Sequence, residues 1–220
     1  MKQNHARESD LFSSLLMNKI THALKASPNW EKIAPFLPDS WKDLFYKNFL
    51  DAKEKIEEAR AILKGHTNLS PYFDETYIKA ALPKITERTA SISKALGLSA
   101  DHLFEIYSIG YEFLQQHNYN DANLIFFLLT TIAPSHPMFW LALAKTEEAQ
   151  EHYEAAAYAY IAGICEKHLD AAINAAYCLQ QAGQIQQARE LLEYVVTHIE
   201  ETPQTMLSLE KIKQYQQTLL

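Results

Sequence analysis

NYNDA at residues 118–122 recurs as HYEAA at 152–156 and again as QIQQA at 184–188. The alanine that ends each segment is followed by the next one after 34 and then 32 residues. A period of about 34 residues is typical of repeated helix pairs, in which each pair buries its apolar face only by stacking on its neighbours. The spacing therefore predicts an array of antiparallel helix pairs.

Three successive windows of the chain fit the tetratricopeptide signature, which is W-x2-L-G-x2-Y, then A-x3-F, then P. The first window, 103–136, places at the signature positions Ile106, Ile109, Gly110, Phe113, Ala122, Phe126, Leu129 and Pro134. The second, 137–170, fits at Trp140, Leu143, Ala144, Ala156, Tyr160 and Gly163, and departs at Glu147 and His168. The third, 169–202, reads Ala172, Ala175, Ala176, Leu179, Ala188, Leu192 and Val195, without a closing proline. We expect Gly110, Ala144 and Ala176 to let the two helices of each pair approach closely.

The rest of the chain divides around these repeats. We predict an all-α protein with a helical N-terminal extension at 1–73 and a further helix before the repeats at 74–98. Three tetratricopeptide-like helix pairs at 99–202 would form a curved array, followed by a C-terminal capping helix at 203–220. Ser99 is the expected N-cap of the first repeat helix. Leu209, Ile212 and Tyr215 form the apolar face that would let the last helix cover the third repeat.

The N-terminal 100 residues contain several expected elements. An aromatic-rich segment runs from Trp30 to Phe49, and a helix is expected from Asp39 or Ser40 to a stop at Gly65. Residues 66–73 read as a linker. Pro83 is expected to kink or divide the helix that follows. We expect residues 30–64 to be folded and docked on the rest of the protein.

Charge and composition exclude several classes of protein. Residues 1–100 carry 15 Lys/Arg and 12 Asp/Glu, a net charge of +3, whereas residues 101–220 carry 5 and 15, a net charge of −10. A half this acidic repels phosphate backbones, so nucleic acid is a poor partner. The chain has no apolar run of about 20 residues and a polar start, which indicates a cytoplasmic protein without stable membrane insertion. We expect the two cysteines, Cys165 and Cys178, to be buried small residues.

Catalysis is not expected from this sequence. It contains no HExxH, no Gly-rich phosphate loop, no G-x-S-x-G and no CxxC, so we predict no enzyme activity, no metal and no cofactor. Acidic pairs such as Glu147 with Glu148 read as solvated helix faces.

A binding face is expected on the first helix of each repeat, at positions 2, 5, 9 and 12 of each window. These positions hold Phe104, Tyr107, Tyr111 and Leu114 in the first repeat, Met138, Leu141, Lys145 and Glu148 in the second, and Asp170, Ile173, Tyr177 and Gln180 in the third. The first of these helices is apolar on two faces, so its second face needs a partner. One alternative is permanent cover by the N-terminal helices, and the other, which we favour, is a groove for a foreign peptide.

The segments IYSIGYEF, FWLALA and AAYCLQQAGQIQQA, in this order and spacing, resemble the class II chaperones of bacterial type III secretion. The resemblance covers about residues 99–200. It implies a cytoplasmic, virulence-associated chaperone that binds an extended apolar segment of a secreted translocator protein and keeps that client soluble and competent for export. It also allows a homodimer through residues 74–96. The N-terminal 70 residues have no counterpart in the resemblance.

Carried over by position, the resemblance implies that Tyr107, Tyr111, Leu141 and Tyr177 line pockets of the groove. The complete set of predicted peptide-binding residues is Phe104, Tyr107, Tyr111, Leu114, Met138, Leu141, Lys145, Ile173 and Tyr177. A generic tetratricopeptide scaffold, or a regulatory adaptor of a secretion apparatus, is the alternative function, because it would share the fold and the groove.

Overall fold

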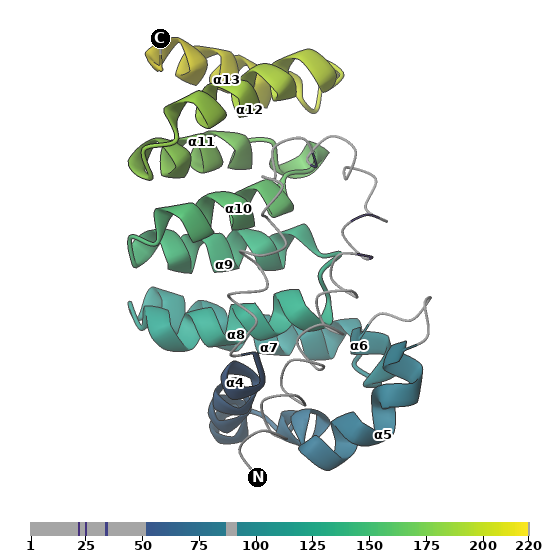
Figure 1. Ribbon diagram of the computed structural model, residues 1–220. Helices are drawn as coiled ribbons and strands as arrows, with labels where there is room; N and C mark the ends of the chain where they lie inside the picture. Colours follow the sequence, from purple (N-terminus) through teal and green to yellow (C-terminus); the bar gives the residue numbers. More distant parts are fainter. Residues whose placement is uncertain (1–21, 23–24, 26–33, 35–51, 87–91, 220) are drawn as a thin grey trace, which may run out of the picture. The chain divides into compact units, whose positions relative to one another are not determined.

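The computed structural model describes residues 22, 25, 34, 52–86 and 92–219, and all regular structure in 52–86 and 92–219 is helical (Figure 1). The predicted all-α class is confirmed. The chain forms two compact units, whose continuously described parts are 52–86 with 92–135 in the first unit and 136–219 in the second. The aromatic-rich segment from Trp30 to Phe49 and the expected helix start at Asp39 or Ser40 lie outside the described residues, apart from Ala34.

The first unit contains one repeat pair and the helices before it. Its elements are α4 (Ala52–His66), the 3-10 helix η2 (Ser70–Phe73), α5 (Glu75–Thr86), α6 (Ile92–Ala95), α7 (Ala100–Gln115) and α8 (Tyr119–Ile132). Helices α7 and α8 pack against each other, and α4 packs on α8. Helix α5 continues through Pro83 as far as Thr86.

The second unit contains the other two pairs and the last helix. Its elements are α9 (Pro137–Ala149), α10 (Tyr153–Gly163), the 3-10 helix η3 (Glu166–His168), α11 (Ala171–Gln181), α12 (Ile185–His198) and α13 (Met206–Thr218). Each α-helix of this unit packs on the next one along the chain, which gives the stack of helices seen in Figure 1. Helix α13 contributes the buried side chains of Leu209 and Ile212, as its sequence pattern predicts.

The same backbone turn joins the two helices of each pair. His117, Glu151 and Gly183 have φ values of 59°, 61° and 78°, in the left-handed region. In each turn the amide of this residue donates to the carbonyl three residues earlier, and the next amide donates to the carbonyl five residues earlier. This double hydrogen bond is the usual way to satisfy the last carbonyls of a helix. The three turns follow the spacing of the repeat, although only the third uses glycine.

A capping box fixes the start of the first repeat helix. The Ser99 hydroxyl accepts a hydrogen bond from the His102 amide at 3.2 Å, and the Ser99 amide donates to Nδ1 of His102 at 3.3 Å. Both bonds satisfy amides that a helix N-terminus would otherwise leave without a partner. The predicted N-cap is confirmed, with histidine in the place where Glu or Gln is usual.

Small residues let the paired helices approach closely, as predicted. Gly110, Ala144 and Ala176 are buried. A Cβ atom added to Gly110 would lie 2.8 Å from Cε1 of Phe126 and 2.9 Å from Cγ2 of Ile125, distances that real Cβ atoms do not show. The α7–α8 contact therefore depends on the missing side chain at position 110.

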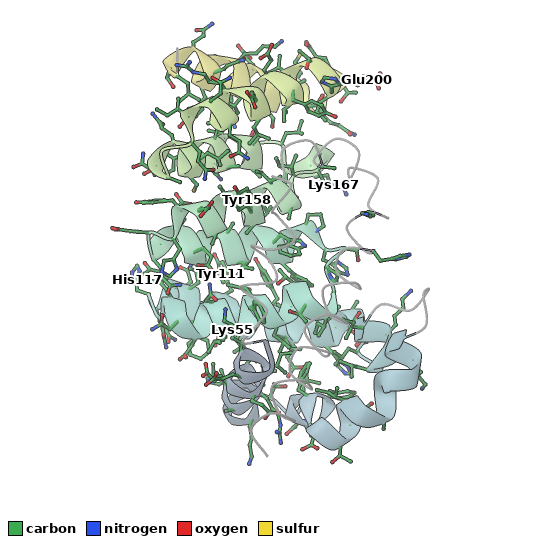
Figure 2. All side chains as sticks on the ribbon, viewed as in Figure 1. Lys55, Tyr111, His117, Tyr158, Lys167 and Glu200 are labelled. Atoms are coloured by element: carbon green, nitrogen blue, oxygen red, sulfur yellow. The ribbon has the colours of Figure 1, made fainter. Side chains whose placement is uncertain are left out.

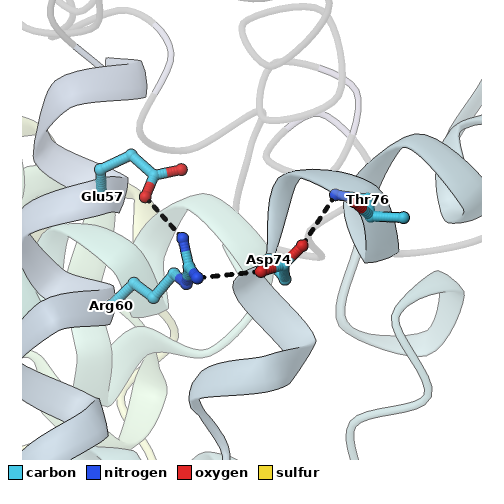
Figure 3. Close-up of polar contacts among 4 residues, drawn as sticks. All are labelled: Glu57, Arg60, Asp74 and Thr76. Carbon is cyan, nitrogen blue, oxygen red and sulfur yellow. Dashed lines mark hydrogen bonds and ion pairs between the residues drawn. The ribbon is translucent and has the colours of Figure 1, made fainter.

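The segment 66–73 is structured, so its interpretation as a linker is wrong. Leu69 and Phe73 are buried, and Phe73 is 1% exposed. These two apolar side chains lie four residues apart, and both are part of the core. Because polar and proline residues lie between them, the sequence of this segment does not show an apolar pattern. Arg60 links α4 to the end of this segment (Figure 3). Its guanidinium donates to Glu57 in α4 at 2.8 Å and to Asp74, directly after η2, at 2.9 Å.

Candidate peptide-binding faces

Three stacked rings form an aromatic stripe along one side of α7, namely Phe104, Tyr107 and Tyr111. The ring centroids of Phe104 and Tyr107 are 6.4 Å apart with planes 22° apart, and those of Tyr107 and Tyr111 are 6.2 Å apart with planes 17° apart. Phe104 is 66% exposed and Tyr111, labelled in Figure 2, is 47% exposed. Large apolar rings at this exposure, in a row on one helix, are typical of an interaction surface.

Tyr107 is the anchor of this stripe and is half-buried. Its ring lies 5.6 Å from the ring of Phe126 in α8, a fully buried residue. Burial, and then the neighbouring Tyr111, raise the pKa of the Tyr107 hydroxyl, so this group remains a protonated hydrogen-bond donor near neutral pH. Tyr107 therefore belongs both to the exposed stripe and to the core, because its ring also packs on Phe126.

The described N-terminal elements contact a different side of α7. His66 packs edge-on against Phe113 at 5.3 Å, Tyr72 lies 5.6 Å from His102, and Thr67 donates a hydrogen bond to Glu105. Helix α4 meets α8 instead, where the ammonium of Lys55, a residue labelled in Figure 2, lies 4.8 Å from the centre of the Phe127 ring. Residues 52–86 therefore leave Phe104 and Tyr111 of the stripe exposed.

The remaining predicted residue of the first unit, Leu114, is half-buried at the end of α7. In the second unit, Met138 is 48% exposed on α9, Lys145 is exposed on the same helix, and Tyr177 is 38% exposed on α11. Ile173 is half-buried one turn before Tyr177. These side chains give the second unit its own accessible surface of mixed apolar and polar character.

Leu141, a predicted pocket residue, also packs between α9 and α10. A Cβ atom added to Gly163 of α10 would lie 2.5 Å from Cδ2 and 2.8 Å from Cγ of Leu141. Leu141 therefore packs directly on the backbone of α10, although it stays half-exposed. Its replacement would disturb the α9–α10 contact as well as any bound peptide.

Two tyrosines that the sequence analysis did not place in the site lie beside Tyr177. The ring of Tyr153, the first residue of α10, is 6.4 Å from that of Tyr177 with planes 89° apart. The Tyr215 hydroxyl on α13 donates to Oε1 of Gln180 at 3.4 Å, one turn after Tyr177. In the sequence, Tyr153 is part of the repeated segment HYEAA, and its place at the start of the second helix of a pair is the signal for a position at the edge of the pair.

Glu147 and Glu148 are not simply solvated, so this interpretation of the acidic pair is wrong. A carboxylate oxygen of Glu148 accepts a hydrogen bond from the buried Tyr160 hydroxyl at 2.5 Å, and Glu147 lies 2.9 Å from Nδ1 of His152. Burial and the hydrogen bond to Glu148 raise the pKa of Tyr160. Both glutamates tie α9 to α10 or to the turn between them.

The two cysteines differ in environment. Cys178 is fully buried, and burial together with the charge of Glu148 raises the pKa of its thiol to about 12. Such a thiol stays protonated and is a poor nucleophile at neutral pH. Cys165 is half-buried, so the expectation that both would be buried is right only for Cys178.

Within 52–86 and 92–219, no three His, Cys, Asp or Glu side chains are grouped so that they could hold a metal ion. None of the helices in these ranges is long and apolar enough to cross a membrane.

Comparison with solved structures shows where this fold occurs. A structure of the type III secretion translocator chaperone SycD from Yersinia enterocolitica matches with a TM-score of 0.51 and 24% identity, over 59% of this chain and 98% of SycD. A type III secretion complex from Aeromonas hydrophila matches with a TM-score of 0.53 and 19% identity, over 66% of this chain and 95% of the matched chain. A chain of the CopN–Scc3 complex matches with a TM-score of 0.51 and 21% identity, over 56% and 74%. The sequence matches no protein-family model and none of the curated proteins. The chain therefore has the fold of the translocator chaperone SycD, in a polypeptide of which that match leaves about two fifths uncovered.

Proposed function

We propose that this protein is a cytoplasmic type III secretion chaperone that binds a translocator protein and keeps it soluble and competent for export. The observation that carries the proposal is the exposed aromatic stripe of α7. It lies on the first helix of the repeats, in a fold that the chain shares with a translocator chaperone from Yersinia enterocolitica. The role that fits these features is binding, and we propose no enzyme activity.

The stripe suits an extended apolar segment of the client. Phe104 and Tyr111 are exposed, and between them the Tyr107 ring packs on Phe126. Tyrosine combines a large contact area with a polar tip and few rotatable bonds, which limits the entropy lost on binding. An extended segment loses much conformational entropy when it is ordered, so a few such anchors must supply most of the affinity.

The accessible residues of the second unit would contribute further contacts. We propose that Met138, Lys145, Ile173 and Tyr177 touch the client as well. Methionine adapts to apolar side chains of different shape, and the lysine stem covers apolar surface while its charge stays in water. We include Leu114 and Leu141 in the same proposal. Both side chains are partly buried, so each is tested by a conservative replacement such as Leu141→Met.

The experiment is a calorimetric titration with the translocator proteins of the same organism, produced as segments of their N-terminal regions. The Phe104→Gln/Tyr111→Gln variant removes two exposed rings and leaves Tyr107 on the core. We expect binding to weaken at least about 30-fold, since truncation of a binding hot spot costs about 2 kcal/mol or more.

The matched control is Ile185→Gln/Leu207→Gln, which removes two apolar side chains that are 44% and 62% exposed elsewhere on the protein. It should bind like the wild type. Equal affinity of the wild type and the Phe104→Gln/Tyr111→Gln variant, in proteins that are folded by circular dichroism, would refute the proposed face. Recovery of the protein from cells in a lasting multiprotein complex, with no translocator bound, would favour the scaffold or adaptor instead.

A further inference from the structure

The turn between α9 and α10 places two carboxylates beside two tyrosine rings. Tyr153 begins α10 directly after this turn, and its ring meets that of Tyr177 from α11 at 6.4 Å, with perpendicular planes. Tyr177 is 38% exposed and Tyr153 is half-buried. The two rings pack edge to face on each other, and the exposed part of Tyr177 leaves ring surface accessible to a further group.

The carboxylates belong to Glu148, in the last turn of α9, and to Glu151, the left-handed residue of the turn itself. The turn brings these two residues together beside Tyr153, because the Glu151 amide donates to the Glu148 carbonyl at 2.9 Å and Glu151 precedes Tyr153 by two residues. In agreement with this, burial raises the pKa of the Tyr153 hydroxyl, and the charge of Glu151 and smaller effects of Tyr177, Cys178 and Glu148 raise it further. One oxygen of Glu148 is used by Tyr160. Within the described part of the chain, no lysine, arginine or histidine forms an ion pair with Glu148 or Glu151.

We infer that Tyr153, Tyr177, Glu148 and Glu151 form a subsite for a lysine or arginine side chain of the bound client. The faces of tyrosine rings attract cations, and the nearby carboxylates add a direct charge attraction. We refer to these four residues as the tyrosine–carboxylate edge. This inference deepens the proposed function and rests on it.

Charge decides between a cationic and an apolar occupant. Residues 136–220 carry 5 Lys/Arg and 11 Asp/Glu, so the surroundings favour a positive group. An apolar side chain could also stack on the rings, but it would take water away from two carboxylates without replacing their hydrogen bonds. An acidic side chain would be repelled.

The test uses small probes that contain no translocator sequence. Protein with ¹³C-labelled tyrosine rings is titrated with N-acetyl-lysine methylamide and, separately, with N-acetyl-norleucine methylamide, which has a side chain of similar shape without the charge. We expect the ring signals of Tyr153 and Tyr177 to shift with the lysine probe at low salt, and the norleucine probe to bind at least about threefold more weakly.

Variants separate charge from shape. Glu148→Gln/Glu151→Gln keeps an acceptor for Tyr160 and should weaken the lysine probe about three- to tenfold. Glu193→Gln/Glu210→Gln removes the same charge from exposed positions on α12 and α13 and should bind the probe as the wild type does. If the first variant does not fold, Tyr177→Leu replaces an exposed ring and should abolish the shift at Tyr153.

Equal shifts with both probes, or an unchanged affinity of the lysine probe in the folded glutamine or leucine variant, would overturn the inference. The calorimetric titration of the client is a separate measurement. Normal client binding without lysine-probe binding removes only the subsite, whereas lysine-probe binding without any client binding removes the chaperone function and leaves a cation-binding edge.

Discussion

Replacement of Gly110 with alanine tests whether the close approach of α7 and α8 holds the first repeat pair together. The new Cβ would lie 2.8 Å from Phe126 and 2.9 Å from Ile125, and both of these side chains are fully buried. Neither can move aside without disturbing other core residues, since protein interiors are packed as densely as crystals. The substitution therefore forces a shift of the helices or of the two side chains.

Two opposing effects set the magnitude. Overpacking of a buried site costs about 1–3 kcal/mol. Alanine in place of glycine in a helix interior contributes about 1 kcal/mol in the other direction. The difference is a net loss of up to about 2 kcal/mol, equivalent to a fall in Tm of up to about 8 °C for a protein of this size.

Gly65→Ala is the matched control. Gly65 also lies in a helix, but a Cβ there meets no atom within 4 Å. This variant should be as stable as the wild type or slightly more stable, because only the propensity effect remains. The two variants thus make the same chemical change with opposite expected signs.

The measurement is thermal unfolding by circular dichroism, together with hydrogen exchange of the α8 amides. Exchange is needed because two compact units need not unfold in one step. Faster exchange in α8 and a lower Tm are expected for Gly110→Ala alone. If Gly110→Ala were stabilised as much as Gly65→Ala, the close packing at position 110 would not be a determinant of this fold.

Three further predictions concern side chains described above. A thiol reagent at pH 8 should label Cys165 and reach Cys178 only after unfolding, because the buried Cys178 thiol has a pKa raised to about 12; labelling of both thiols at equal rates in the native protein would contradict this. Tyr160→Phe should cost about 1–3 kcal/mol in urea unfolding near pH 7 through the lost hydrogen bond to Glu148. The pKa of Tyr160 is higher in the folded than in the unfolded protein, where it is about 10. The hydroxyl therefore contributes its full stabilisation below about pH 10 and loses it as the pH rises from there through the folded pKa, so the stability of the wild type should approach that of the variant at high pH. His117→Gly should raise the stability of the first unit by about 0.5–1 kcal/mol, measured by α7 amide exchange, because φ of 59° disfavours side chains other than glycine.

The sequence predicts the parts of this fold that depend on local periodicity. The helix pairs and the buried Gly110 follow from the repeat, and the Ser99 cap follows from the residue type at the start of the first repeat helix. All three depend on contacts between residues less than one period apart. The exposure of the Phe104 and Tyr111 rings is also predicted locally, because their helix is apolar on two faces.

What the sequence does not predict depends on contacts outside the repeat pattern. Arg60 reaches Asp74 across 14 residues, and this link has no periodic signal. Glu148 reads as a surface acid until the buried Tyr160 hydroxyl is seen to need an acceptor. Tyr153 fits the repeat pattern, and that pattern relates it only to equivalent positions in the other repeats. Its contact with Tyr177 of the next helix pair is therefore seen only in the structure.

The two accessible surfaces differ in chemistry, and this difference bears on selectivity. The α7 stripe offers three aromatic rings and no charged group, and rings of this kind accept many apolar segments. The tyrosine–carboxylate edge would reject acidic segments and disfavour purely apolar ones, which leave its carboxylates without partners. Selectivity arises from differences in affinity, so the edge can discriminate among clients even if it contributes little to the total affinity. A client that carries both an apolar stretch and a basic residue would be distinguished by this protein from the many other polypeptides that carry only the first.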